Sequence, residues 1–324
     1  MSPVSQAHQI WRRLSRSPAF GPLVALLVIY GLFSALSPNT FVGWINFTTM
    51  VRQTAVVGIV AVGMTLIMIQ GGIDLSVGSL VALTTVVIAR SIQGGQGAFT
   101  AALCGIGVAL IAGLVNGVLV VSLRITPFIV TLGTMSLARG LAKGFAHEQK
   151  IDARTTGLSD LMVLSHQQAS HVFPVGVWIA LAVASLAAVM LGFTRLGRHI
   201  VATGSNPATA RLCGIDIARV TILVYLIAGI LAGLAGVLEF STLTVGDPTD
   251  SVGLELEVIA AVVIGGGSLS GGQGSIVGSL LGALLLTFIG TGCTHVGLPN
   301  WVQEILTGAI IIVAMGLERL RRSR

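Results

Sequence analysis

The chain reads Gly71-Gly72-Ile73-Asp74-Leu75-Ser76-Val77-Gly78-Ser79-Leu80-Val81-Ala82-Leu83 between two apolar runs, residues 55–70 and 77–89. We interpret both runs as embedded in a lipid bilayer. Two adjacent glycines weaken a helix by about 1 kcal/mol each, so we expect the chain to bend or break at Gly71 and Gly72. Asp74 and Ser76 then stand where a new helix begins, and both are favourable N-cap residues.

Asp74 has two interpretations. An ionisable residue at membrane depth is by default a functional candidate, because charge is costly in lipid. A broken helix is tolerated there only beside protein or a water-filled cavity. Asp74 either caps a helix near the membrane surface or shapes a polar path, and both interpretations remain open. Our candidate path residues are Asp74, Ser76, Asn116, Phe128 and Thr131, the last three from the apolar runs that follow.

A second stretch resembles the first. Residues 71–80 can be laid over residues 271–280 without a gap, and six of the ten positions are identical. Both stretches have apolar runs on each side. This pattern indicates an internal repeat, and many transport proteins place their path at the junction between such repeats.

The composition is that of an integral membrane protein. The chain has 324 residues, of which 54% are hydrophobic and 9% charged, whereas a soluble domain carries about 25% charged residues. The formal charge of +6 does not indicate nucleic-acid binding, because the basic residues lie at the ends of apolar runs. The three cysteines are scattered, so the sequence predicts neither a disulfide framework nor a metal site. It contains no Walker A motif and no recognisable catalytic constellation.

We predict an all-α polytopic membrane protein of about ten transmembrane helices with an internal repeat. With spans of about 20 residues, a single transmembrane domain covers residues 20–318. A cytoplasmic segment, 1–19, precedes it and a basic cytoplasmic tail, 319–324, follows. The predicted spans lie near 20–37, 54–70, 77–93, 99–122, 127–145, 174–193, 219–240, 256–268, 275–292 and 302–318.

The basic residues predict the orientation. If both termini are cytoplasmic, 12 of the 18 Lys and Arg residues lie on the inner side, as the positive-inside rule requires. This orientation places the long polar loop 146–173 outside and the loop 194–219 inside. Either loop is a solvated connector or a surface that meets a partner.

The inner loop contains the pattern of a short helix. Asn206 can cap it with Pro207 at the first helical position, and Gly214 can end it. A short helix on the cytoplasmic face can dock into the groove of a partner protein.

Four segments together resemble the permease subunits of ribose-type bacterial ABC importers. They are GGIDLSVGSLVAL (71–83), TPFIVTLGTMSLARG (126–140), GSNPATARLCGI (204–215) and IAAVVIGGGSLSGGQGS (259–275). Their order and spacing fit, and the resemblance covers about residues 50–318. Ser205, Cys213, Gly267 and Gln273 depart from residues that are frequent in the family.

The resemblance implies the partners and the site. Such subunits pair with a second permease, identical or a close paralogue, in the inner membrane among its lipids. A cytoplasmic ABC ATPase binds the ATP, and a periplasmic protein delivers the sugar, so no cofactor is expected on this chain. By the same resemblance, residues 71–78 lie beside the translocation path. The ATPase-coupling residues would be Gly204, Asn206, Pro207, Ala210, Arg211 and Gly214.

Three other functions are considered. The chain is alternatively an ABC permease for another small solute, such as branched-chain amino acids. A stand-alone ion-coupled transporter would need buried carboxylates or histidines, and Asp74 is the one strong candidate in the sequence. A membrane enzyme would need a catalytic constellation, which we do not recognise.

Overall fold

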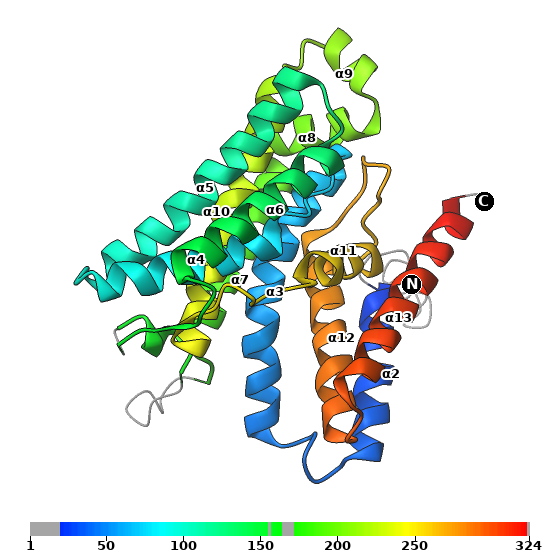
Figure 1. Cartoon of the computed structure of the whole chain (residues 1–324). Helices are drawn as coiled ribbons and strands as arrows, with labels where there is room; N and C mark the ends of the chain where they lie inside the picture. The colour runs from blue at the N-terminus through cyan, green and yellow to red at the C-terminus, as the bar shows by residue number, and fades with distance from the viewer. Residues whose placement is uncertain (1–19, 155–156, 164–171, 323–324) are drawn as a thin grey trace, which may run out of the picture.

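A computed structural model describes residues 20–154, 157–163 and 172–322 of the chain. Within them the fold is helical, with twelve α-helices and two two-residue strands, which confirms the predicted all-α class (Figure 1). The predicted N-terminal segment 1–19 lies outside these residues. The helices are α2 (Phe20–Leu36), α3 (Trp44–Gln70), α4 (Val77–Gln93), α5 (Ala98–Leu123), α6 (Pro127–Ala146), α7 (Val175–Phe193), α8 (Arg195–Ser205), α9 (Pro207–Leu212), α10 (Ile217–Leu243), α11 (Leu254–Ile264), α12 (Ile276–His295) and α13 (Asn300–Arg322).

Each of the ten predicted spans coincides with one helix, and α8 and α9 form the predicted inner loop. Five of the helices, α3, α5, α7, α10 and α12, are long and apolar enough to cross a membrane. Helix α11 is shorter than predicted. Its 11 residues extend about 16 Å, which is about half the thickness of the bilayer core.

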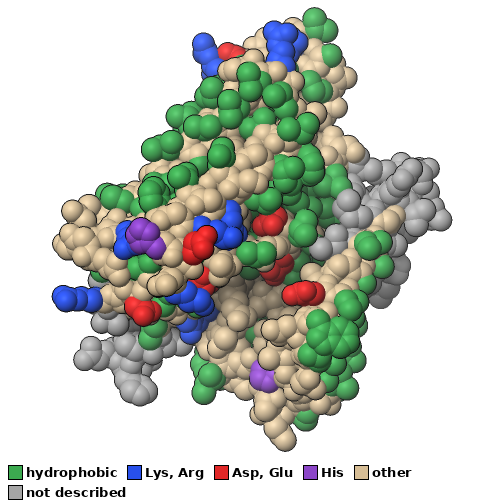
Figure 2. All heavy atoms as spheres, viewed as in Figure 1, with side chains coloured by type: hydrophobic (Ala, Val, Ile, Leu, Met, Phe, Trp, Pro, Cys, Tyr) green, Lys and Arg blue, Asp and Glu red, His purple; other side chains and the backbone are tan. Residues whose placement is uncertain are grey.

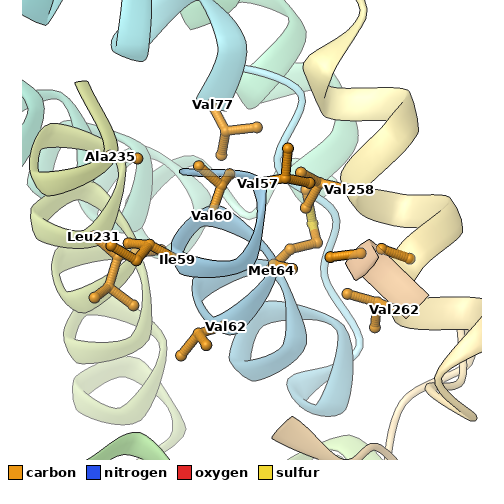
Figure 3. Close-up of a cluster of buried hydrophobic side chains, with 14 of the residues drawn as sticks. Val57, Ile59, Val60, Val62, Met64, Val77, Leu231, Ala235, Val258 and Val262 are labelled. Atoms are coloured by element: carbon orange, nitrogen blue, oxygen red, sulfur yellow. The ribbon is translucent and has the colours of Figure 1, made fainter. Parts of the chain in front are cut away.

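Helix α3 is the centre of the molecule. It is apolar on all sides, as expected of a helix with no face toward solvent, and it is buried from Ala55 to Ile69. It packs against α10, α12, α7, α11 and α8. Figure 3 shows its side chains between Leu231 and Ala235 of α10 on one side and Val258 and Val262 of α11 on the other. The outer helices α5 and α7 are largely exposed, and their large apolar side chains suit contact with lipid.

Two irregular segments interrupt the helices: the first break, residues 71–76, and the second break, residues 265–275. Helix α3 ends at Gly71, whose φ of 93° is left-handed and favours glycine, and α4 begins six residues later. The second break lies between α11 and α12, where Ser275 caps α12 by accepting a hydrogen bond from the Gly278 N–H. The stretches 71–80 and 271–280 therefore open α4 and α12 at positions that agree within one residue. They also lie side by side, because Gly271 packs against Gly71.

A small two-stranded sheet packs beside the second half of α4. Strand β1 (Ile151–Asp152) pairs antiparallel with β2 (Val245–Gly246). The predicted outer loop 146–173 is thereby attached to the segment that follows α10. Its residues 155–156 and 164–171 lie outside the part of the chain that the structure describes.

Candidate functional site

Asp74 lies in the first break and is almost completely buried, with 2% of its surface exposed. Its Oδ1 accepts hydrogen bonds from the Ser76 N–H at 2.8 Å and from the Ser76 hydroxyl at 2.5 Å. Ser76 is the N-cap residue of α4. Asp74 therefore does not cap the helix directly; it fixes the cap residue through a local turn of the kind that Asp favours.

The network continues across three helices. Asn116 of α5 donates from Nδ2 to the Ser76 hydroxyl at 3.1 Å, and Thr134 of α6 donates to Asn116 Oδ1 at 2.5 Å. Thr131, one turn earlier on α6, donates to the carbonyl oxygen of Ile73 at 3.2 Å. The structure thus brings together Asp74, Ser76, Asn116 and Thr131. Thr134 was missed, although its spacing of three residues from Thr131 places both on one helix face.

Burial limits what this network can do. Its polar atoms bond to one another and all five side chains are buried, so in this conformation they hold α4, α5 and α6 together and are closed to a solute. Phe128, the remaining candidate path residue, does not join them. Its side chain is 49% exposed on α6.

The predicted coupling segment, residues 194–219, forms the two short helices α8 and α9 at one end of the molecule (Figure 1). Asn206 caps α9 by accepting a hydrogen bond from the Thr209 N–H at 3.0 Å, and Pro207 occupies the first helical position. Gly214 follows α9 with a left-handed φ of 80°. The predicted cap and stop are confirmed.

The coupling segment has an inner and an outer side. Ala210 is buried with 3% exposed, so its side chain seats α9 on the protein. Arg211 is exposed, and Leu212 is 89% exposed. Sequence reasoning missed Leu212, although a large apolar residue at the end of a short helix in a polar loop is a recognisable signal.

Gly204 connects the coupling segment to the first break. A Cβ at this position would overlap the carbonyl oxygen of Ile69 and the backbone nitrogen of Gly272. Helix α8 therefore touches the last turn of α3 backbone to backbone. Only glycine permits so close an approach, so Gly204 has a packing role that the turn chemistry of the loop did not reveal.

Among the described residues, no group of three His, Cys, Asp or Glu side chains is placed to hold a metal ion. The polar groups of the first break make structural hydrogen bonds to one another.

The comparisons with known proteins agree with this arrangement. The family model described as branched-chain amino acid transport system / permease component matches residues 46–315. The chain belongs to this permease family. It is a multi-pass inner-membrane protein and a transport component, and the resemblance noted from its four motifs is confirmed.

The curated relatives extend over nearly the whole permease. It is 41% identical over 293 residues to the ribose import permease protein RbsC of Escherichia coli K12, covering 90% of this chain and 91% of that protein. It is 33% identical over 314 residues to the fructose import permease protein FrcC of Rhizobium meliloti, covering 94% and 86%. It is 34% identical over 290 residues to the autoinducer 2 import system permease protein LsrC of Yersinia pseudotuberculosis, covering 90% and 81%. No solved structure gives a significant match.

Proposed function

We propose that this permease is the transmembrane subunit of an ATP-driven importer that moves a monosaccharide across the bacterial inner membrane. The observation that carries the proposal is the direct contact of the coupling segment with the broken helix, through Gly204 and Ile69. A force applied to α8 from the cytoplasm meets the end of α3 without an intervening flexible linker. The polar network that starts at Asp74 begins four residues beyond that end.

The importer needs partners for this mechanism. A cytoplasmic ABC ATPase would dock on α9 and bind the ATP, with Arg211 and Leu212 at the contact. A second permease, identical or a close paralogue, would complete the path, and a periplasmic binding protein would deliver the sugar. Helix α6 supports the pairing, because its exposed face combines large apolar side chains with open glycines. That face includes Phe128, Ile129, Leu132, Gly133, Leu137, Gly140, Leu141 and Gly144, a composition suited to helix packing in membranes.

The topology follows from the same arrangement. The chain would cross the membrane ten times with both termini in the cytoplasm. The eighth crossing combines the irregular segment 248–253 with the half-length helix α11, which is tolerated where backbone lines a cavity. The internal repeat of 71–80 and 271–280 is supported by their contact and by the matching starts of α4 and α12.

The substrate class is inferred from the relatives. Ribose, fructose and autoinducer 2 are named for proteins that are similar over most of both chains. The family description favours a second candidate, a branched-chain amino acid. A monosaccharide is preferred because two of these three relatives are named as import permeases for sugars. A stand-alone ion-coupled transporter is disfavoured, because Asp74 is engaged by two hydrogen bonds from Ser76.

Reconstitution tests the proposal. The permease would be incorporated into liposomes with the ATPase and the binding protein encoded beside it. Uptake of radiolabelled D-ribose, D-xylose, L-arabinose, D-fructose and L-leucine would be measured with and without ATP. We expect ATP-dependent uptake of at least one sugar and none of leucine. Uptake of leucine alone, or uptake independent of ATP, would contradict the proposal.

A further inference from the structure

A cavity of about 520 Å3 lies between α4, α6 and the segment that leads into α11. Figure 2 shows acidic and basic side chains gathered around a depression in the molecular surface. Small-molecule sites usually occupy roughly 300–1,000 Å3, so the cavity has the size of such a site. The polar side chains that line it are Ser79, Ser136, Arg139, Lys143, Thr249 and Glu255.

The cavity keeps hydrogen-bonding capacity that the network around Asp74 has used up. Arg139 donates from Nη1 to the carbonyl oxygens of Pro248 at 2.8 Å and Asp250 at 2.7 Å. Since a guanidinium has five N–H donors, three remain for a solute. The side chains of Lys143 and Glu255 make no hydrogen bond or salt bridge within the described part of the chain.

The same contacts make the cavity rigid. Arg139 fixes the segment 247–253 to α6, and Lys150 binds Asp247 at 2.9 Å. Thr249 donates to the same carboxylate at 2.7 Å. Glu255 packs against Gly78 in the first turn of α4, where the helix dipole favours a negative charge. Groups held in this way bind a ligand without first paying the cost of being ordered.

The charges indicate the kind of ligand. Two cationic side chains and one carboxylate face the cavity, with hydroxyls between them, so a solute of large net charge meets groups of both signs. A neutral polyol satisfies them all, because adjacent hydroxyls donate to a carboxylate and accept from a guanidinium or an ammonium. Met135 and Val252 provide the apolar wall that covers the C–H face of a sugar ring.

We propose that this cavity is a transient monosaccharide-binding site on the import route, in which Glu255 accepts from ring hydroxyls and Arg139 and Lys143 donate to them. The proposal rests on the proposed function and deepens it. It assigns the contacts with the sugar to residues other than the buried network. Asp74, Ser76 and Asn116 support the helices behind the site, and the solute passes in front of them.

Solute protection of an introduced cysteine tests the site. The reconstituted importer would carry Ser136→Cys after Cys104, Cys213 and Cys293 are replaced by serine. Labelling by a charged methanethiosulfonate reagent would be followed with ATP and either the empty binding protein or one loaded with the sugar that the wild type transports fastest. We expect the sugar to slow labelling at least threefold. Gln149→Cys, which is exposed but lies outside the cavity, is the control, and its labelling should not change.

Two substitutions test binding with little risk to folding: Glu255→Gln keeps the size of the side chain, and Lys143→Gln changes an exposed one. Glu255→Gln and Lys143→Gln should remove the protection of Ser136→Cys and slow uptake at least tenfold and threefold, respectively. The amount of permease assembled with the ATPase should stay within twofold of the wild type, which would show that both variants still fold. Equal protection of Ser136→Cys and Gln149→Cys would overturn the binding site but not the proposed importer. Wild-type uptake by both Glu255→Gln and Lys143→Gln would do the same. If the wild-type complex transports no sugar, the proposed function itself fails, and the binding assignment fails with it.

Discussion

The backbone N–H of Gly272 donates to the carbonyl oxygen of Ile69 at 2.7 Å. The last carbonyls of a helix lack partners within the helix, and here the second break of the chain supplies one to the end of α3. Gly204 of α8 packs on the same carbonyl group. Three segments that are far apart in the sequence therefore meet at one backbone junction, between helix α8 and Asp74.

Replacement of Gly204 by alanine should disturb this junction. The added Cβ would overlap the Ile69 carbonyl oxygen, and relief requires that α8 move away from α3. Overpacking costs about 1–3 kcal/mol, so we expect a lower thermal midpoint and a fivefold or greater loss of uptake per ATP hydrolysed. Gly192→Ala is the control, since nothing lies within 4 Å of that position. A Gly204→Ala variant with wild-type coupling would show that the junction does not transmit motion.

Leu212 should be an anchor for the ATPase. It is 89% exposed, so Leu212→Glu leaves folding and membrane insertion unchanged but places a charge where an apolar contact is expected. Interface anchors commonly cost 2 kcal/mol or more when lost, which corresponds to roughly a thirtyfold weaker association. Co-purification of the ATPase with the permease measures this. Leu212→Met should retain the partner, and retention by both variants would place the contact elsewhere.

Much of the helical arrangement follows from the sequence. Apolar runs of about 20 residues predict helices well because an isolated chain in lipid must satisfy its backbone internally. The cap at Asn206 and the break at Gly71 were also predicted, since both depend on local backbone chemistry. Helix α11 was predicted too long, because the last four residues of the predicted span, 265–268, are three glycines and a serine, and the helix ends before them at Ile264.

The cavity could not be predicted in this way. Arg139 and Glu255 are 116 positions apart in the sequence, and they line one space only because the segment 247–253 turns back toward α4. In the sequence, Glu255 stands just before the predicted span 256–268, a position that carries no local sign of a cavity. The close approach at Gly204 is likewise a tertiary fact, because a glycine in a turn-rich loop has a sufficient local explanation.

The ion pair of Lys150 and Asp247 should be insensitive to pH between 5.5 and 8. Burial opposes ionisation of Asp247, but hydrogen bonds from Thr249 and Lys150 outweigh it and lower the pKa of Asp247. The bond to Asp247 and its charge raise the pKa of Lys150. The stabilisation from a lowered carboxyl pKa is present above its unfolded value of about 3.9 and is lost as the pH falls through the folded pKa. For the lysine it is present below about 10.4 and lost as the pH rises through the folded pKa.

The test is uptake by Lys150→Ala at external pH 5.5 and 8. The lysine side chain is largely exposed, and exposed pairs contribute little, so we expect a reduction of twofold or less that is equal at both pH values. A reduction that disappears at pH 5.5 would show that the segment 247–253 is held by a group that titrates in this range.

Tyr225→Phe tests a buried hydroxyl. Tyr225 is 1% exposed, and its hydroxyl makes no hydrogen bond within the described residues, although it lies beside Gly72. An unsatisfied buried polar group costs about 1–3 kcal/mol, so phenylalanine should leave the thermal midpoint unchanged or raise it. Tyr225→Leu should lower it, because the ring packing is lost. Reduced uptake by Tyr225→Phe at an unchanged midpoint would show that the hydroxyl acquires a partner in another state of the transport cycle.

Substitutions of Asp74 separate the effect of its hydrogen bonds to Ser76 from the effect of its charge. Asparagine keeps an acceptor for the Ser76 N–H and hydroxyl, so Asp74→Asn should assemble normally and transport within about threefold of the wild type. Alanine leaves both Ser76 donors buried without Asp74, at a cost of about 1–3 kcal/mol, so Asp74→Ala should lower the abundance of the complex first. Uptake per assembled complex is the deciding measurement, because it divides out the loss of protein. If Asp74→Asn loses uptake sharply at wild-type abundance, the carboxylate charge itself acts on the path. The two bonds to Ser76 would then be only part of its role.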